Sequence, residues 1–546
     1  MRRLALTLGM TLLATTVASA QIKKMVRNNA PAEALSAAER SQLGDPLFIL
    51  ALRSHPNEGD VQKIVDIVKG TSAQVHFFVV DELIADPAPA GSRRAVLAFR
   101  GVSQTLKLDP NVMLSVLVTP TGITPNFIEA WGWDDRRARF NFYRFEQASN
   151  EQAPGWKFRG SSIDADRQTP SQRRGTCLAC HVNGEPLMKE LTLPWNNWHS
   201  TSFAATYLRP SGANPWPVVA NLPLLTRLEN ARVLQTDFIQ LAMTRFNRSR
   251  ADASIKRNAQ GTPTVLNGMQ AIIDGRRLLR PLFETTQYNL VSSGTLSGLH
   301  PFPAASGGPV GPIAVPATFF LNANLLAGGG ATQYQGLAIA EALSFNTLAR
   351  ISADEYRTLV NGDGTTIGGR SGDANFAWFV PGASHVDNHM IDLLVTRGVI
   401  TKAFAAAAMA VDVETPVFST KTPGLLRFIP TTFRFKPLAA GAGPAAHPDR
   451  LTRAVIAALQ AASPAAGTPE ADFLTLLQDP NPLSTLRQRV LRYRQRVQTR
   501  LDDATTRAAE LRRLFHIAVD RRRAALNHPV LGALTESDAL FPVPQQ

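Results

Sequence analysis

The sequence predicts an α+β protein that is predominantly helical, with an antiparallel β-meander in front of a Cys-x-x-Cys-His segment and a helical C-terminal region. Two observations predict this class. Short runs rich in aromatic and β-branched residues occur between residues 75 and 160, and this is the composition of strands. Beyond residue 224, apolar residues recur mainly at steps of three and four, which is typical of amphipathic helices.

The chain begins with the features of a secretory signal peptide. Arg2 and Arg3 precede an apolar run over residues 4–17, and a small-residue cleavage signature follows it. This run is too short to span a membrane, and no other run reaches the length of a transmembrane helix. We therefore expect cleavage after Ala20, a periplasmic or secreted protein, and no transmembrane span.

The balance of charges is strongly basic. The 546 residues carry a formal net charge of +14, and residues 485–523 alone hold twelve arginines and four acidic residues. Exported proteins rarely meet nucleic acid, so we expect no nucleic-acid partner. An acidic partner protein, a membrane surface or solubility alone would each account for the charge.

The N-terminal elements follow from local patterns. After a loose entry segment with a short helix, residues 45–69 read as two helices separated by Pro56. Strands are expected over residues 75–80, 95–99 and 112–118. A meander is expected over residues 126–133, 138–146 and 155–160, leading directly into the Cys-x-x-Cys-His segment.

The meander is the most aromatic part of the chain. These residues either form the core of a sheet or make one face of it the apolar wall of a binding pocket. The aromatic positions are Phe127, Trp131, Trp133, Phe140, Phe142, Tyr143, Phe145, Trp156 and Phe158.

The central motif joins Cys177, Cys180 and His181, and it contains both cysteines of the chain. A disulfide between them would close a very small loop and constrain little. A thioredoxin-like redox pair needs a βαβ setting that the flanks do not offer. A zinc site needs two further thiols or histidines at ligand spacing, and there is no second cysteine pair.

This segment resembles the haem-attachment site of bacterial c-type cytochromes. The resemblance is limited to the segment. It implies one covalent haem c, held through thioethers to Cys177 and Cys180, with His181 as the proximal ligand of the haem iron. It also implies that haem attachment takes place after export, which agrees with the signal peptide.

A second axial ligand must come from elsewhere in the chain. Met188 and His199 are the nearest candidates in sequence, and Met243 lies at the spacing usual for the distal methionine of small c-type cytochromes. His385 and His389 are further candidates, because residues four apart share one face of a helix. Each of them can instead be a core or surface residue.

The segment around residue 385 is also the candidate for acid–base chemistry. His385, Asp387 and His389 lie at a helix start, where an aspartate beside a histidine can accept its hydrogen bond. Gly398 is expected to end this helix, and Thr401 to cap the next one.

The other helices are placed by periodicity. A long amphipathic helix is expected over residues 224–246, and further helix over 251–283 with a break at 261–263. One or two C-terminal helices are expected over residues 486–518, through which the chain can oligomerise. The resulting division is 1–20 signal peptide, 21–165 α+β region, 166–290 haem-binding helical region, 291–437 mixed region and 438–546 helical region.

Three classes of function fit these features. The first is an electron carrier that exchanges electrons with a redox partner protein. The second is a haem peroxidase or oxygenase with an open distal iron position, which would explain a large body around one haem. The third is a protein in which the haem is a sensor or a structural element.

Overall fold

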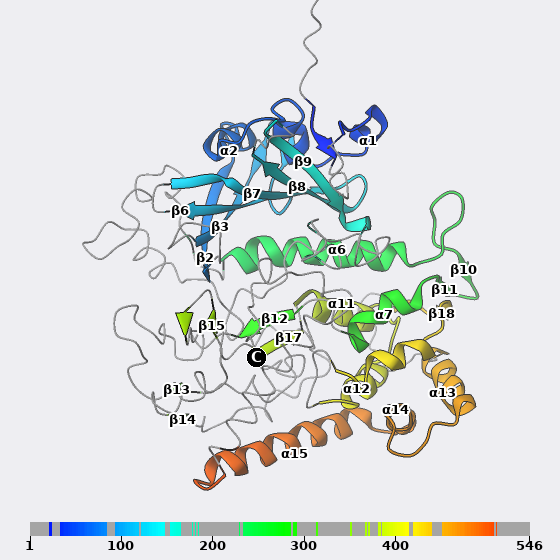
Figure 1. Ribbon diagram of the computed structural model, residues 1–546. Coiled ribbons are helices and arrows are strands. Elements are labelled where there is room, and N and C mark those ends of the chain that lie inside the picture. Colours follow the sequence, from blue (N-terminus) through cyan, green and yellow to red (C-terminus); the bar gives the residue numbers. More distant parts are fainter. Residues whose placement is uncertain are drawn as a thin grey trace, which may run out of the picture.

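The computed structural model of the protein confirms the α+β class, because both helices and antiparallel sheets are present. Figure 1 shows the large sheet at one end, a long helix beneath it and a helical body at the other end. The structure describes residues 21–24, 33–83, 93–119, 122–147, 153–164, 177, 181, 184, 229, 233–284, 288–291, 313–314, 350–351, 366–367, 370–371, 380–383, 385–413, 419–438, 450–506 and 509.

The large sheet has seven strands in the order β1-β9-β8-β7-β6-β3-β2. Neighbouring strands are antiparallel except β1 and β9, which are parallel. Strands β6 to β9 pair in sequence order, and β7 to β9 are the predicted meander. The bounds are β1 Lys23–Lys24, β2 Gln74–Leu83, β3 Arg93–Arg100, β6 Val112–Thr119, β7 Gly122–Asp134, β8 Arg139–Glu146 and β9 Gly155–Ser161.

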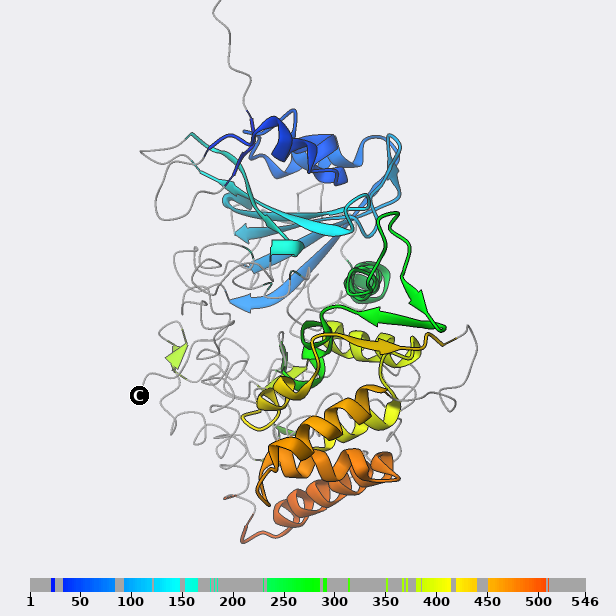
Figure 2. The same cartoon turned by 90° about the vertical axis from the view of Figure 1, so that its right-hand side faces the viewer.

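Helices cover one face of this sheet. They are α1 (Ala37–Ser41), the π-helical segment η1 (Phe48–Leu52) and α2 (Val61–Lys69). Figure 2 shows them on the side of the sheet opposite α6 (Gln240–Ala253). The predicted break between two helices is confirmed, because the chain leaves η1 before Pro56 and Asp60 caps the start of α2.

A buried carboxylate fixes η1 to the sheet. Asp45 accepts hydrogen bonds from the Tyr143 hydroxyl at 2.6 Å and the Asn141 amide at 2.7 Å, both on β8. It also accepts from the backbone N–H of Phe48 at 2.9 Å. A Cβ at Gly132 would lie 2.1 Å from Asp45 Oδ1, so only glycine leaves room for this contact. Burial raises the pKa of Asp45, and its three donors act in the opposite sense.

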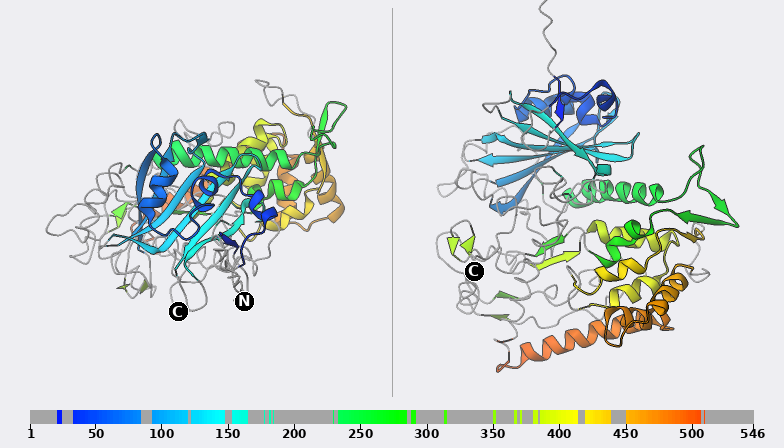
Figure 3. Two further views of the ribbon diagram at one scale, coloured as in Figure 1. Left: turned by 90° about the horizontal axis from the view of Figure 1, so that it is seen from above. Right: turned by 45° about the vertical axis from the view of Figure 1, so that its right-hand side comes forward.

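The other face is covered by η6 (Leu234–Ile239) and α6, which run beneath the strands (Figure 3). We call the buried side chains between them the lower core. It contains Phe78, Val96, Ala98, Met113, Trp131, Trp133, Phe140, Phe142, Leu234, Phe238, Ile239, Ala242, Met243 and Phe246. The rings of Trp131 and Trp133 meet the ring of Phe140 edge to face, with ring centroids 4.8 and 4.7 Å apart.

The helical body has a core of its own around three mutually packed rings, Phe283, Phe404 and Phe473. As predicted, Thr401 caps α12 by accepting from the Phe404 N–H at 3.0 Å, and Gly398 follows α11 with a φ of 73°. The helices are α7 Gly275–Phe283, α11 His385–Thr396, α12 Lys402–Ala410, η10 Pro423–Phe428, α13 Arg450–Ala462, α14 Pro469–Gln478 and α15 Pro482–Asp502.

The helix predicted over residues 251–283 is wrong for much of its length. Strands β10 (Val265–Leu266) and β11 (Met269–Ile272) form a hairpin there, and β11 pairs with β18 (Phe433–Phe435). The turn is Asn267-Gly268, with φ values of 52° and 72°. This dipeptide is a strong hairpin signal, because both residues tolerate a positive φ. Here it prevails over the helical periodicity of the flanking residues.

The remaining described elements are short, and none of the described helices meets the length and apolarity needed to cross a membrane. The first part of the predicted C-terminal helical segment is confirmed as α15, which ends at Asp502, and residues 510–518 of that prediction lie outside the described residues. The short elements are β4 Val102–Ser103, β5 Leu106–Lys107, η2 Ser162–Asp164, β12 Tyr288–Val291, β13 Ile313–Ala314, β14 Arg350–Ile351, β15 Thr366–Ile367, β16 Arg370–Ser371 and β17 Val380–Ala383.

Candidate functional site

A backbone hydrogen bond closes a turn between Cys177 and His181. The backbone N–H of His181 donates to the Cys177 carbonyl at 2.9 Å, and the Gly184 N–H donates to the His181 carbonyl at 2.7 Å. The bond from His181 to Cys177 has the i to i+4 spacing of an α-helical hydrogen bond. Cys180 lies outside the described residues.

Gly184 lets this turn approach the sheet. Its φ is 78°, and a Cβ at this position would lie 2.5 Å from the Cα of Ser162 in η2. Both the backbone conformation and the lack of space therefore require glycine. The contact places Gly184 directly beside η2, which follows β9.

The turn is docked on the lower face of the sheet. The half-buried Cys177 packs against the lower core. The imidazole of His181 stacks on the ring of Phe142 in β8, with centroids 5.4 Å apart and planes inclined by 19°. The Nδ1 atom of His181 is shielded from solvent. Thiol and imidazole thus meet an apolar, aromatic surface rather than open water.

The aromatic residues of the meander divide between the two faces of the sheet. Trp131, Trp133, Phe140 and Phe142 belong to the lower core, on the side of Cys177. Tyr143, Phe145 and Trp156 belong to the core beneath α1, η1 and α2, and Phe158 packs against it. The side chain of Phe127 lies outside the described residues. Because side chains alternate along a strand, β7 and β8 each contribute to both cores, whereas the aromatic residues of β9 face the core beneath α1, η1 and α2.

Met243 is the distal candidate whose side chain reaches the same core as Cys177. It lies on α6, is 3% exposed and packs in the lower core. Its thioether is therefore held in apolar surroundings on the face of the sheet where the Cys177–His181 turn is docked. The sequence left Met243 either as a distal ligand or as a core residue beside an apolar helical stripe, and the structure places it in the lower core.

His389 is engaged between two helices. On α11, its Nδ1 lies 3.0 Å from the amide nitrogen of Asn247, and its Nε2 lies 3.5 Å from the Thr244 hydroxyl, both on α6. The backbones of His385 and Asp387 belong to α11, but their side chains are not among those described. Met188 and His199 also lie outside the described residues.

Arg159 brings a buried positive charge to the site. It lies on β9 with its side chain 4% exposed and pairs with Glu146. Burial lowers the pKa of its guanidinium, and Cys177 is close enough to influence it electrostatically. The sequence pattern drew no attention to this residue. Its signal is a charged position two residues beyond Lys157 in β9, alternating with the apolar Trp156 and Phe158.

A second feature missed by the sequence argument is a buried pair, His76 and Glu229. His76 lies on the edge strand β2 with its side chain 2% exposed, and its Nδ1 binds the Glu229 carboxylate. Its Nε2 is buried and has no hydrogen-bond partner among the described residues. A carboxylate on one ring nitrogen is how proteins orient ligating or basic histidines.

His76 is remote from His181. Strands β2 and β8, which carry His76 and Phe142, are separated by four strand spacings, or about 19 Å across the sheet at about 4.8 Å per spacing. The two histidines therefore belong to different sites. Among the described residues, no group of three His, Cys, Asp or Glu side chains is arranged to hold a metal ion.

The chain matches no known protein-family model, and neither curated proteins nor solved structures match it significantly.

Proposed function

We propose that this protein is an exported mono-haem c-type cytochrome that transfers electrons. One haem c would be held by thioethers to Cys177 and Cys180, with His181 as the proximal iron ligand. The observation that carries the proposal is the backbone hydrogen bond between His181 and Cys177, with both residues packed on an apolar sheet face. When bound, the haem supplies one-electron chemistry at its iron.

The residues at this turn fit such a group. Nδ1 of His181 is shielded from solvent, and we expect Nε2 to be the nitrogen that binds the iron. Stacking on Phe142 restricts the imidazole to one orientation, so less rotamer freedom is lost when it binds. The aromatic wall excludes water from this side, which disfavours the more charged ferric form and raises the reduction potential.

Met243 is the distal ligand that we favour. Its thioether lies in the same core as the Cys177 contact, whereas both ring nitrogens of His389 face side chains of α6. A methionine at the sixth position would fill it, and a filled position favours electron transfer over turnover of peroxide or dioxygen. A peroxidase or oxygenase is the alternative, with an open position instead.

Arg159 is suited to the acidic edge of the haem. Haem carries two propionate groups, and a buried guanidinium binds carboxylates in a forked geometry. Arg159 already forms an ion pair with Glu146. We therefore expect the guanidinium to hold a propionate alongside the Glu146 carboxylate. The positive charge would also stabilise the ferrous form.

The test uses the full chain produced with haem-attachment machinery. Covalent haem should remain after denaturation and disappear in the double variant Cys177→Ala/Cys180→Ala. Haem that stays bound to the denatured double variant would falsify the assignment. An absorption spectrum of the ferrous protein with carbon monoxide then separates the two functions: an unchanged low-spin spectrum supports the carrier, and a shifted one supports the enzyme.

A further inference from the structure

The segment between α6 and α7 projects from the helical body. We call residues 254–273 the arm, which contains β10, β11 and two turns, one at residues 258–261 and one between the two strands. The right-hand view of Figure 3 shows the β10–β11 hairpin reaching outward past the helices of the body. Most residues from 256 to 268 are exposed, so the arm is a surface feature along most of its length.

The base of the arm is fixed to the helical body. Ile255 and Ile272 are 9% and 0% exposed and belong to the core of this body. Strand β11 pairs with β18, and the backbone N–H of Lys256 donates to the Ala271 carbonyl at 2.8 Å. The arm is therefore anchored at one end, and its outer part is held away from the core.

Local hydrogen bonds shape the turn at residues 258–261. The side-chain oxygen of Asn258 accepts from the backbone N–H groups of Gln260 at 3.1 Å and Thr262 at 2.9 Å. The guanidinium of Arg257 donates to the carbonyl of Gly261 at 2.7 Å, and Gly261 has a φ of 77°. These contacts lie within the arm itself, so this turn takes its shape from its own residues.

Exposed apolar side chains are concentrated on the arm. Of the five large ones among the described residues, three belong to it: Val265 is 56% exposed, Leu266 52% and Ile273 45%. The other two, Val102 and Leu241, lie apart on β4 and α6. Val265 and Leu266 are adjacent and directly precede the β10–β11 turn, so they form an apolar tip. Exposed apolar groups that lie together often mark a site of interaction.

The arm carries cations and no acidic residue. Lys256 and Arg257 are its only charged residues and give it a formal charge of +2. Both residues are exposed. The backbone N–H of Thr264 donates to the Lys256 carbonyl at 2.8 Å, which places these cations beside the strand that carries Val265. The apolar tip thus has positive charge next to it.

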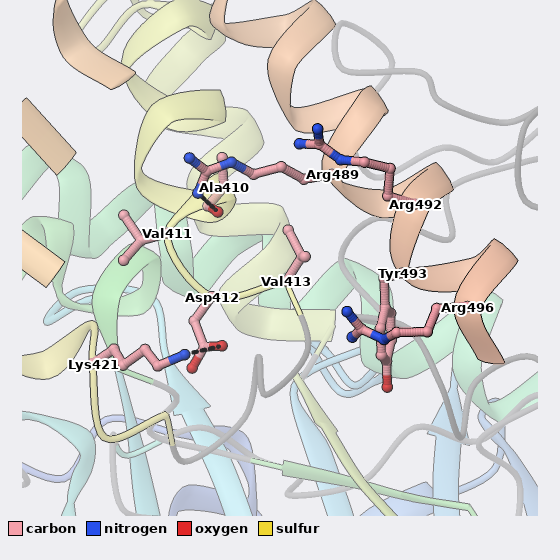
Figure 4. Close-up of a pocket in the computed structure, with 9 residues that line it drawn as sticks. All are labelled: Ala410, Val411, Asp412, Val413, Lys421, Arg489, Arg492, Tyr493 and Arg496. Carbon is pink, nitrogen blue, oxygen red and sulfur yellow. Dashed lines mark hydrogen bonds and ion pairs between the residues drawn. The ribbon is translucent and has the colours of Figure 1, made fainter. Parts of the chain in front are cut away.

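Helix α15 is also rich in arginine, but its arginines serve a different purpose. A pocket of about 280 Å³ opens between the end of α12 and α15 (Figure 4). There Arg489 donates to both oxygens of Asp472 at 2.7 Å and to the Ala410 carbonyl at 2.9 Å, a contact within the protein. On the arm, by contrast, the cations accompany exposed apolar side chains.

We propose that the arm docks on the surface of an anionic lipid membrane. Val265 and Leu266 insert among the lipids, and Lys256 and Arg257 lie at the level of the headgroups. Anionic headgroups attract lysine and arginine, and insertion of apolar side chains adds to this attraction.

The small size of the tip favours a membrane over a protein partner. A stable protein interface buries about 1,200–2,000 Å² of surface, whereas two adjacent side chains at the end of a narrow hairpin offer only a small area. A bilayer accepts such a tip without a complementary shape, because its binding depends on buried apolar area and charge.

Co-sedimentation of the full chain with lipid vesicles tests this. The probe is a vesicle of phosphatidylcholine mixed with phosphatidylglycerol, and the comparison is a vesicle of phosphatidylcholine alone. Binding to the mixed vesicles should be at least about ten-fold stronger than to the neutral ones. It should weaken as salt is added, because salt screens the attraction between the cations and the headgroups.

A double variant tests the apolar tip. Val265→Ser/Leu266→Ser should weaken binding to the mixed vesicles by about ten-fold, because both side chains lose the gain from leaving water. Both are exposed, so thermal unfolding should be nearly unchanged. Val102→Ser/Leu241→Ser is the matched control, since it removes two apolar side chains of similar exposure, 46% and 51%, from other surfaces. The control should bind normally.

A single variant tests the charge. Lys256→Gln should weaken binding to the mixed vesicles by about five-fold, the loss expected for one cation near an anionic surface. Arg487→Gln, exposed on α15, is the control for the net charge of the whole protein and should bind normally.

Three results would overturn the proposal: no binding to the mixed vesicles, equal binding to both kinds of vesicle, or equal losses in the arm variants and their controls. Self-association that Val265→Ser/Leu266→Ser abolishes, without vesicle binding, would instead make the arm an interface between copies of the chain. The arm contains no residue of the proposed haem site. Failure here therefore leaves the electron-transfer proposal standing, and failure of haem attachment leaves this one standing.

Discussion

The imidazole of His181 lies nearly parallel to the ring of Phe142, with centroids 5.4 Å apart. This contact joins the Cys177 turn to the meander that precedes it in sequence. It makes the position of the proposed iron ligand depend on β8, a strand that also carries Tyr143 and Asn141 into the opposite core. One sheet therefore has two different faces, and the proposed haem site lies on one of them.

Replacing Phe142 should disturb the haem without preventing its attachment. Phe142→Leu keeps an apolar surface but removes the stacked ring, which contributes about 0.5–1.5 kcal/mol. We expect covalent haem to remain and the low-spin ferric electron paramagnetic resonance signal to broaden, because the imidazole loses its fixed orientation. Phe145→Leu, buried on the other face of the same strand, should lower stability similarly and leave the signal unchanged. Identical signals in the two variants would contradict the role of the stack.

Removing the thioether of Met243 should open the sixth iron position. Met243→Leu nearly conserves volume, so the free energy of unfolding should fall by less than about 1.5 kcal/mol. The ferric spectrum should become high-spin, and the ferrous protein should bind carbon monoxide. Met113→Leu is the control, since Met113 is a buried methionine of the same core on β6. A low-spin spectrum in Met243→Leu would assign the distal position to another residue.

Neutralising Arg159 should lower the reduction potential of the haem. Loss of a buried positive charge removes stabilisation of the ferrous form, and 1.4 kcal/mol corresponds to about 59 mV for one electron. A fall on the order of 60 mV in Arg159→Gln, measured by redox titration, is the expected result. Arg139 donates to the Gln42 carbonyl beside α1, on the other face, so Arg139→Gln should leave the potential unchanged. Equal shifts in both variants would argue against a local effect.

Asp392 should make the stability of the helical body depend on pH. Burial raises the pKa of this carboxyl to about 6, and nearby Lys402 partly opposes the shift. The folded pKa exceeds the unfolded one of about 3.9, so the unfolded state ionises first and this group's contribution to stability falls as pH rises through that interval.

Asp392→Asn should therefore be more stable than the parent at neutral pH. Since the group is only partly buried, we expect a gain of about 1–2 kcal/mol above pH 7, which shrinks toward zero near pH 4. Urea unfolding at several pH values measures it. Asp66→Asn, on the exposed side of α2, controls for loss of a surface carboxylate. A gain that does not vary with pH would contradict the assignment to burial.

The strands and several helix ends were predictable because their signals are local. Runs of aromatic and β-branched residues marked β2, β3 and β6 to β9, and Gly398 and Thr401 marked the boundary between α11 and α12. The helix expected over residues 251–283 was wrong because two local signals conflict there. Helical periodicity was given more weight than the Asn267-Gly268 turn, whose positive φ angles produce the hairpin.

The sequence by itself determined the chemistry that we propose, because Cys-x-x-Cys-His spacing is a property of adjacent residues and survives any arrangement of the rest. Only the tertiary structure decided what surrounds it. Met243 reaches the core that Cys177 packs against by the packing of α6, and Arg159 reaches the neighbourhood of Cys177 by the pairing of β9 with β8. Contacts between residues distant in the chain depend on which faces of helix and sheet exclude water together, and no local pattern encodes that choice.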